Sequence, residues 1–270
     1  EALIQDPEVE AIYIATPPAY HMEYVLRCAK AGKPVYVEKP MARNYEECQA
    51  MINACEEAKV PLFVAYYRRA LPRFLKVKEL IEQGQIGEVR FVTITLYQKA
   101  RDDEYSEATR PWRVIPEIAG AGKFMDLASH TLDVLDFILG PVSEAQGMAS
   151  NQGGLYEAED IVTSNLKFGT IHGVGTWCFT AFDEYDMNEI VGSKGKIRFS
   201  SFGNEPIELI TIEGKTEFPI DNPLNIQQPL IQTVVNELNG FGHCPSKGIS
   251  AARTNKVMDD ILKRYRETNL

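Results

Sequence analysis

The chain has 270 residues and a formal net charge of −10, and hydrophobic residues make up 44% of it. This composition is typical of a globular protein with about two domains, and it excludes a chain that is disordered throughout. The acidic balance argues against nucleic acid and against an anionic membrane surface as the main partner, because both bind clustered Lys and Arg. No apolar run approaches the roughly 18 residues of a membrane span.

The cysteines and the first residues add two expectations. The five cysteines are scattered, odd in number and free of any C-x-x-C pair, which predicts a reduced, cytoplasmic protein. Residues 1–7 have the pattern of the end of a helix, with no initiator methionine and no N-cap before them. We therefore expect an N-terminally truncated chain, whose length understates that of the protein.

The first 66 residues alternate between short apolar runs and amphipathic stretches. The patterns predict strands over 9–15, 34–37 and 61–65, and helices over 21–31 and 44–59. Asn44 is a suitable N-cap for the second helix. Nearly all-apolar strands that alternate with helices indicate a parallel sheet covered on both faces.

From residue 67 onward the pattern changes to one of mainly short strands. Helices are predicted over 71–83, 124–139, 226–238 and 249–268, and strands over 89–97, 142–149, 160–168, 170–179, 186–191, 196–200 and 207–212. Short Gly-rich turns join consecutive strands, which indicates an antiparallel sheet. The polar stretch 101–122 is predicted to be irregular. We therefore predict an α/β fold with a parallel-sheet domain over 1–66 and an α+β domain over 67–270.

Three polar residues share one face of the predicted helix 124–139. Asp126 and His130 are four positions apart, and Asp133 follows three positions later. Such a stripe on an otherwise apolar helix is costly to bury unless its members pair or serve a site. One interpretation makes His130 an acid or base oriented by a carboxylate. The other, favoured for the helix taken alone, is a solvated stripe or a buried, satisfied histidine. A metal site is the weaker case, because no third ligand is suitably spaced.

Two turns follow predicted strands at the edge where open α/β sheets place their ligands. One contains Glu38-Lys39-Pro40, and the other contains Thr16-Pro17-Pro18 followed by His21. A helix start at the second turn can offer amides to a phosphate or ribose. A solvated lysine and an ordinary Pro-rich turn are the alternatives. No complete dinucleotide fingerprint, P-loop or G-x-S-x-G motif is present, which excludes P-loop and serine-hydrolase interpretations.

Together these motifs resemble the Gfo/Idh/MocA family of NAD(P)-dependent oxidoreductases. Each motif is weak alone, but the ordered set is specific and spans essentially the whole chain. The residues that carry the resemblance are Thr16-Pro17-Pro18, His21, residues 31–35, Glu38-Lys39-Pro40, Trp112-Arg113, Gly120, Gly122, Asp126, His130, Asp133, Glu159-Asp160 and residues 192–195. The Trp-Arg pair followed by the Asp and His helix is similar to 1,5-anhydrofructose reductases and related sugar or cyclitol dehydrogenases.

The resemblance implies a fold and a set of roles. Residues 1–66 become the C-terminal part of a Rossmann domain, and the second domain's large open sheet forms homodimers or homotetramers. Lys39, before an often cis peptide bond, positions substrate and cofactor; His130 exchanges the hydroxyl proton; Asp126 binds substrate and orients His130. Cofactor contacts are implied for Thr16, Pro17, Pro18, His21, Glu38, Lys39, Trp112 and Arg113.

The chain departs from the family pattern in two places. The opening strand, its Gly-rich turn and the ribose-reading residue of the second strand are absent, so roughly 60 residues are expected to be missing. We expect poor dinucleotide binding by the chain as given, and NAD versus NADP is left open because the discriminating residue falls in that part. Lys123, after Gly120 and Gly122, is expected to alter the substrate mouth.

The sequence thus predicts hydride transfer between NAD(P) and a CH–OH or carbonyl carbon of a small sugar, cyclitol or polyol-like substrate, without a metal. A base near neutral pH and a nearby cation both assist that reaction. The first rival is a non-catalytic dinucleotide- or sugar-sensing paralogue of the family, against which Lys39, Asp126 and His130 speak. The second is redox-assisted glycoside cleavage on the same scaffold. The polar stretch 101–110 is expected to border the pocket.

Overall fold

Three short parallel strands form the first sheet of the molecule. They are β1 (Ile12–Ile14), β2 (Val35–Val37) and β3 (Leu62–Val64), hydrogen-bonded in that order. Helices α2 (His21–Lys30) and α3 (Tyr45–Glu57) connect them. Every residue of β2 and β3 is buried, as expected of strands in a covered parallel sheet. The predicted strand–helix alternation is therefore confirmed, with strands shorter than predicted.

The computed structural model describes residues 2–269. Its first turn of helix, α1 (Ala2–Gln5), precedes β1. Asn44 caps α3 as predicted, because its side chain accepts a hydrogen bond from the Glu47 amide at 2.9 Å. All five cysteines are free thiols, and three of them lie in the core between α2, α3 and the strands.

Eight strands form the second sheet, in the order β11-β10-β9-β8-β4-β7-β6-β5. They are β4 (Val89–Tyr97), β5 (Glu144–Ser150), β6 (Ile161–Phe168), β7 (Ile171–Cys178), β8 (Tyr185–Gly192), β9 (Gly195–Phe199), β10 (Ile207–Thr211) and β11 (Gly214–Phe218). Strands β4 and β7 pair in parallel, and the other neighbours are antiparallel. The predicted large, mainly antiparallel sheet is confirmed.

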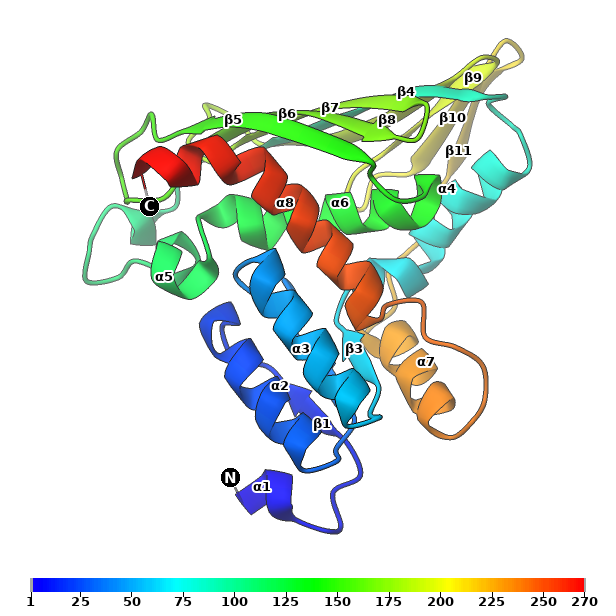
Figure 1. Cartoon of the computed structure of the whole chain (residues 1–270). Helices are drawn as coiled ribbons and strands as arrows, with labels where there is room; N and C mark the ends of the chain where they lie inside the picture. Colours follow the sequence, from blue (N-terminus) through cyan, green and yellow to red (C-terminus); the bar gives the residue numbers. More distant parts are fainter. Residues whose placement is uncertain (1, 270) are drawn as a thin grey trace.

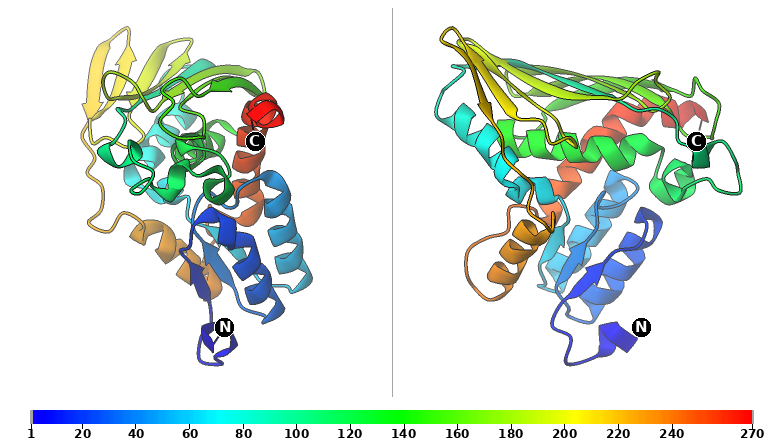
Figure 2. Two further views of the ribbon diagram at one scale, coloured as in Figure 1. Left: turned by 90° about the vertical axis from the view of Figure 1, so that its left-hand side faces the viewer. Right: turned by 180° about the vertical axis from the view of Figure 1, so that it is seen from behind.

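Helices cover one face of the large sheet (Figure 1). These are α4 (Pro72–Glu82), α6 (Lys123–Leu139) and α8 (Gly248–Asn269). Phe124 of α6 meets Trp177 of β7 edge to face, with ring centroids 5.1 Å apart. Within residues 2–269, the opposite face carries no helix in any of the three views (Figure 1 and Figure 2). No helix in this part of the chain has the length and apolarity to cross a bilayer.

The C-terminal segment returns to the first sheet. Helix α7 (Gln228–Leu238) packs Leu230 and Val234 against Phe63 of β3. Lys247 forms an isolated antiparallel bridge with Phe63, and the start of α8 joins the core of the first sheet. The C-terminal segment therefore packs against the sheet formed by the first 66 residues. The domain boundary near residue 66 remains a proposal.

Irregular structure was predicted where the chain forms short helical turns. The stretch 101–122 contains the 3-10 turns η3 (Asp102–Glu104) and η4 (Trp112–Val114) and the single-turn helix α5 (Pro116–Ala119). Two other 3-10 turns, η1 (Pro18–Tyr20) and η2 (Tyr67–Ala70), follow β1 and β3. Both therefore lie at the carboxyl edge of the first sheet, where its turns face α5 and α6.

Candidate active site

Lys39 and Asp126 meet at the centre of the candidate site. Lys39 follows β2, and Asp126 lies in the first turn of α6. Lys39 Nζ donates to the backbone oxygen of Asp126 at 3.1 Å and forms an ion pair with Asp126 Oδ1. The Lys39–Pro40 peptide bond is cis, as the family resemblance implied. The structure thus joins the two motifs that sequence analysis had placed on separate elements.

A second cation binds the same carboxylate. Arg113 Nε donates to Asp126 Oδ2 at 2.9 Å, and the Arg113 guanidinium lies 4.5 Å from the centre of the Trp112 ring. Because η4 places both residues against α6, the predicted Trp-Arg pair borders the site. Both oxygens of Asp126 are therefore occupied by cationic donors.

His130 lies one turn further along α6 and is 5% exposed. Its ring meets Tyr67 and Phe202 edge to face, with centroids 5.4 and 5.6 Å away. Arg68 of η2 places Nη1 2.5 Å from His130 Nδ1. Burial, followed by the charges of Arg68 and Lys39, holds the pKa of His130 well below its usual range. A buried, neutral imidazole results.

The partner of His130 differs from the expected one. Within residues 2–269, no hydrogen bond joins Asp126 to His130. Asp126 binds Lys39 and Arg113 instead, and the imidazole of His130 is hydrogen-bonded to Arg68. Sequence reasoning missed Arg68. Arg68 could have been proposed as a site residue from its position just after the predicted strand 61–65, at the same sheet edge as Lys39.

Asp133, the third member of the polar stripe, lies outside the site. Arg69 donates to its two carboxylate oxygens from Nε and Nη2, each at 2.8 Å. Burial raises the pKa of Asp133, and the Arg69 guanidinium opposes that shift. Asp133 is therefore buried and paired with Arg69.

His21 joins two turns inside the fold. Its Nε2 lies 2.7 Å from the Thr16 carbonyl oxygen, and its Nδ1 lies 3.1 Å from that of Met41. The ring has no exposed surface, and burial lowers its pKa. His21 therefore holds the Thr16 turn against the turn after Lys39, and the structure leaves no surface on its ring for a direct cofactor contact. The Thr16 hydroxyl is buried and has no hydrogen-bond partner among the described residues.

Glu38 is held by side chains from both ends of the chain. Tyr13 of β1 and Gln227 both donate to Glu38 Oε1, at 2.5 and 2.8 Å. The other carboxylate oxygen accepts from the Lys39 amide at 3.1 Å. This carboxylate therefore fixes the backbone from which Lys39 extends.

The approach to α6 is held by a buried carboxylate. The Gly122 amide donates to both oxygens of Glu159 at 2.9 Å each. Burial raises the pKa of Glu159 to about 7, and the Gly122 amide opposes the shift. A side chain at Gly120, where φ is +92°, would collide with the Arg43 carbonyl oxygen.

Lys123 does not reach a substrate mouth. It is buried in an ion pair with Glu104, itself fully buried in η3. The expectation that Lys123 alters the substrate mouth is wrong, because its ammonium is buried against the Glu104 carboxylate. Glu104 belongs to the stretch 101–110 and neutralises the lysine that stands where the family pattern has glycine. That stretch therefore contributes Glu104 to the interior.

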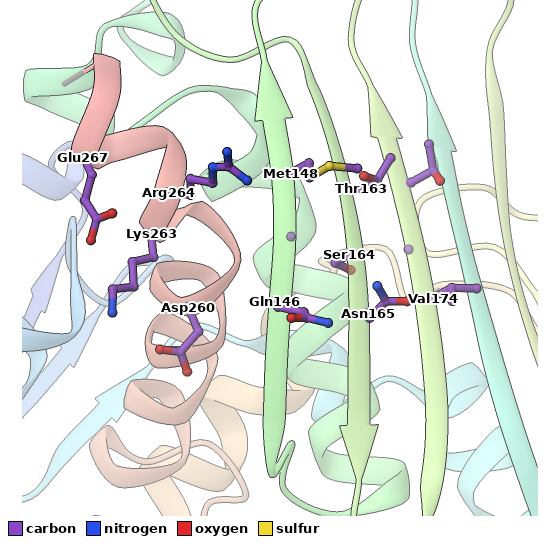
Figure 3. Close-up of a pocket in the computed structure, with 13 residues that line it drawn as sticks. Gln146, Met148, Thr163, Ser164, Asn165, Val174, Asp260, Lys263, Arg264 and Glu267 are labelled. Atoms are coloured by element: carbon purple, nitrogen blue, oxygen red, sulfur yellow. The ribbon is translucent and has the colours of Figure 1, made fainter.

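A hollow of about 840 Å³ lies elsewhere, between β5, β6, β7 and the outer side of α8 (Figure 3). Figure 3 shows the charged side chains of α8 on one side and the uncharged side chains of the strands on the other. None of its lining residues belongs to the site around Lys39. Among residues 2–269, no group of three or more His, Cys, Asp or Glu side chains could hold a metal ion.

Comparison with known proteins identifies the family. Residues 1–66 match the oxidoreductase family with an NAD-binding Rossmann fold, and residues 74–198 match the GFO/IDH/MocA C-terminal domain. An oxidoreductase of Formosa agariphila is 34% identical, over 96% of this chain and 80% of its own length. The chain belongs to the Gfo/Idh/MocA family. Members of this family are NAD(P)-dependent oxidoreductases.

Relatives within the Gfo/Idh/MocA family act on sugars and cyclitols. The 1,5-anhydro-D-fructose reductase of Ensifer adhaerens is 28% identical, over 92% of this chain and 75% of its own length; other relatives are named levoglucosan, inositol and xylose dehydrogenases. The WlbA dehydrogenase of Bordetella pertussis, solved with NADH and UDP-GlcNAcA, is 28% identical with a TM-score of 0.81, over 98% of this chain and 79% of that one.

Proposed function

We propose that this protein transfers a hydride between NAD or NADP and the CH–OH or carbonyl carbon of a sugar, cyclitol or polyol-like substrate. The observation that carries the proposal is the Lys39 ammonium, held by Asp126 beside His130 at the carboxyl edge of the first sheet. The names of the family relatives support the substrate class.

The residues around Lys39 fit the nicotinamide end of a dinucleotide. The Thr16 hydroxyl is a buried polar atom without a partner at the end of β1, and Lys39, Trp112 and Arg113 lie beside Asp126. We propose that Thr16, Pro17, Pro18, Glu38, Lys39, Trp112 and Arg113 hold the cofactor, with His21 supporting the Thr16 turn. When bound, the nicotinamide supplies or accepts the hydride.

Lys39 and His130 are the groups that would meet the substrate oxygen. A cation at Lys39 stabilises negative charge as it develops on that oxygen, and Asp126 keeps the ammonium in place. His130 Nε2 has no hydrogen-bond partner among residues 2–269. The atom keeps some accessible surface, so a ligand can reach it. Both groups are close enough to the site to contact the hydroxyl that exchanges its proton.

The test, made on the full-length gene product, is a panel of sugars, cyclitols and polyols assayed with NAD⁺ and NADP⁺ for formation of reduced nicotinamide. We expect turnover of at least one compound, and its loss in K39M. The matched control is K78M, because Lys78 pairs with Glu82 on the surface of α4. Dinucleotide binding without turnover would instead indicate a sensing paralogue, and mass spectrometry would reveal glycoside cleavage in the products.

We also propose a homodimer or homotetramer formed through the uncovered face of the large sheet. Met148 and Val174 on that face are 71% and 49% exposed, and exposed apolar side chains of this kind mark interaction sites when they gather on one surface. The free thiols support a cytoplasmic location for this assembly.

A further inference from the structure

Arg68 is a buried cation without an ion-pair partner among residues 2–269. It is 4% exposed, and its Nε donates to the Ser201 carbonyl oxygen at 2.9 Å. Its guanidinium lies 4.6 Å from the centre of the Phe202 ring. The nearby Asp186 carboxylate accepts from backbone amides instead. Burying a charge in this way is costly unless its donors are paired, and the Arg68 guanidinium hydrogen-bonds to Tyr67 and His130 as well.

The contact between Arg68 and His130 fixes where the imidazole carries its hydrogen. A guanidinium only donates, so His130 Nδ1, 2.5 Å from Arg68 Nη1, must be the unprotonated nitrogen. A neutral ring then carries its hydrogen on Nε2. The opposite tautomer would set N–H against N–H, and a doubly protonated ring would add a third cation beside Arg68 and Lys39.

We propose that Arg68 is a positioning residue that fixes His130 with its hydrogen on Nε2, so that His130 donates a hydrogen bond to the substrate oxygen instead of accepting the hydroxyl proton. The inference rests on the proposed function and deepens it. A neutral Nε2–H has no lone pair with which to take a proton.

Proton exchange then belongs to Lys39. In carbonyl reduction, an N–H bond of the Lys39 ammonium breaks and an O–H bond forms on the substrate, while the carbon gains its hydride from the reduced nicotinamide. Lys39 is left as a neutral amine. In oxidation, the amine takes the hydroxyl proton as the hydride leaves the carbon, and Asp126 stabilises the ammonium that forms.

Several charged or titratable groups surround His130, and each bears on its titration. Arg68 and Tyr67 come from η2, Lys39 follows β2, and Asp126 lies one turn earlier on α6. Asp186 of β8 lies beyond Arg68 and stabilises the guanidinium. The groups that contact the ring or lower its pKa are cationic or neutral, so they disfavour the imidazolium.

The experiment is ¹⁵N NMR of the histidine side chains of the whole chain, which distinguishes protonated from unprotonated ring nitrogens. The chain has four histidines, and H130N assigns the signal. We expect the Nε2–H form with no titration between about pH 6 and 8, a range that brackets the ordinary histidine value of about 6.5. An Nδ1–H form, or a titration in this range, would overturn the proposal.

Variants at Arg68 test the cause. In R68M we expect both tautomers and a His130 pKa closer to the ordinary value; in R68K, which keeps one donor, we expect the wild-type tautomer. R73M is the matched control, because Arg73 is similarly buried but donates to the carbonyl oxygens of Gly203 and Glu205. A folded R68M with the wild-type tautomer would overturn the proposal. If R68M does not fold, the wild-type and R68K spectra test the proposal, and an Nδ1–H tautomer in either protein would overturn it.

Kinetics separates this inference from the proposed function. If His130 donates a hydrogen bond, H130N should retain at least about tenfold more kcat/KM than H130A, because the amide N–H replaces the donor. Equal losses in the two variants would count against the proposal. Absence of turnover with any substrate, together with the expected tautomer, would defeat the proposed function while the effect of Arg68 on His130 stands.

Discussion

Asp126 binds the ammonium of Lys39 twice, through its carboxylate and through its backbone carbonyl oxygen, which lies 3.1 Å from Nζ. The two residues are 87 positions apart in the sequence. Asp126 lies in the first turn of α6, where the helix dipole stabilises a carboxylate. The start of α6 thus fixes the Lys39 ammonium, which extends from the turn after β2 of the first sheet. The position of Lys39 therefore depends on the Asp126 carboxylate.

This dependence predicts non-additive losses. K39M should lower kcat/KM by about 10²–10⁴-fold, the usual contribution of a proton-transfer group. D126N should lower it by about 10²-fold, because Lys39 and Arg113 both lose their charged partner. If Asp126 acts through Lys39, the double variant should be no slower than K39M. Steady-state kinetics measures all three, with K78M as the control; multiplicative losses would show that the residues act independently.

The second prediction concerns stability. R69M should lower the free energy of unfolding by about 3–5 kcal/mol, because it leaves the buried Asp133 carboxylate without its cation. Arg253 binds Asp136 in the same network but is 39% exposed, so R253M should cost about 1 kcal/mol or less. Urea unfolding followed by circular dichroism compares them. Equal losses in R69M and R253M would mean that the burial of an ion pair does not decide how much it contributes to the free energy of unfolding.

Local patterns explain what the sequence could predict. Apolar periodicity and the Asn44 cap are properties of neighbouring residues, so the helices and most strands follow from them. Strand β11 was missed because its side chains are largely exposed, which leaves no apolar alternation to recognise. The resemblance to a family supplied Lys39, Asp126 and His130 as a set, and the helical spacing placed the last two on one face.

Partners across the fold could not be predicted. Arg68 and His130 are 62 positions apart, and Lys123 meets Glu104 from another turn. No local pattern distinguishes an arginine that orients a histidine from one that pairs with an aspartate, as the adjacent Arg69 does. His21 had the position of a ligand contact, but only the packed structure shows that both its nitrogens face backbone carbonyl oxygens.

Glu159 makes stability depend on pH. Its pKa is raised to about 7 by burial, whereas an unfolded glutamate titrates near 4.3. Between these values the unfolded chain releases the proton first, so stability is highest at the acidic end and falls by up to about 1.4 kcal/mol per pH unit. E159Q has no such proton. We expect wild type to lose about 3 kcal/mol relative to E159Q between about pH 4.5 and pH 8 in urea unfolding; parallel profiles would contradict the raised pKa.

The uncovered sheet face gives the last prediction. Val174 of β7 lies between Thr93 and Asn165 in register, on the third strand from the β5 edge of that face. In a two-fold assembly through this face, a glutamate here would meet its own symmetry copy or a neighbouring buried surface, so V174E should dissociate the proposed oligomer while circular dichroism stays unchanged. Sedimentation velocity measures the difference. I212E is the control, because Ile212 is fully exposed in the turn after β10. Identical sedimentation of V174E and wild type would exclude this face as the interface.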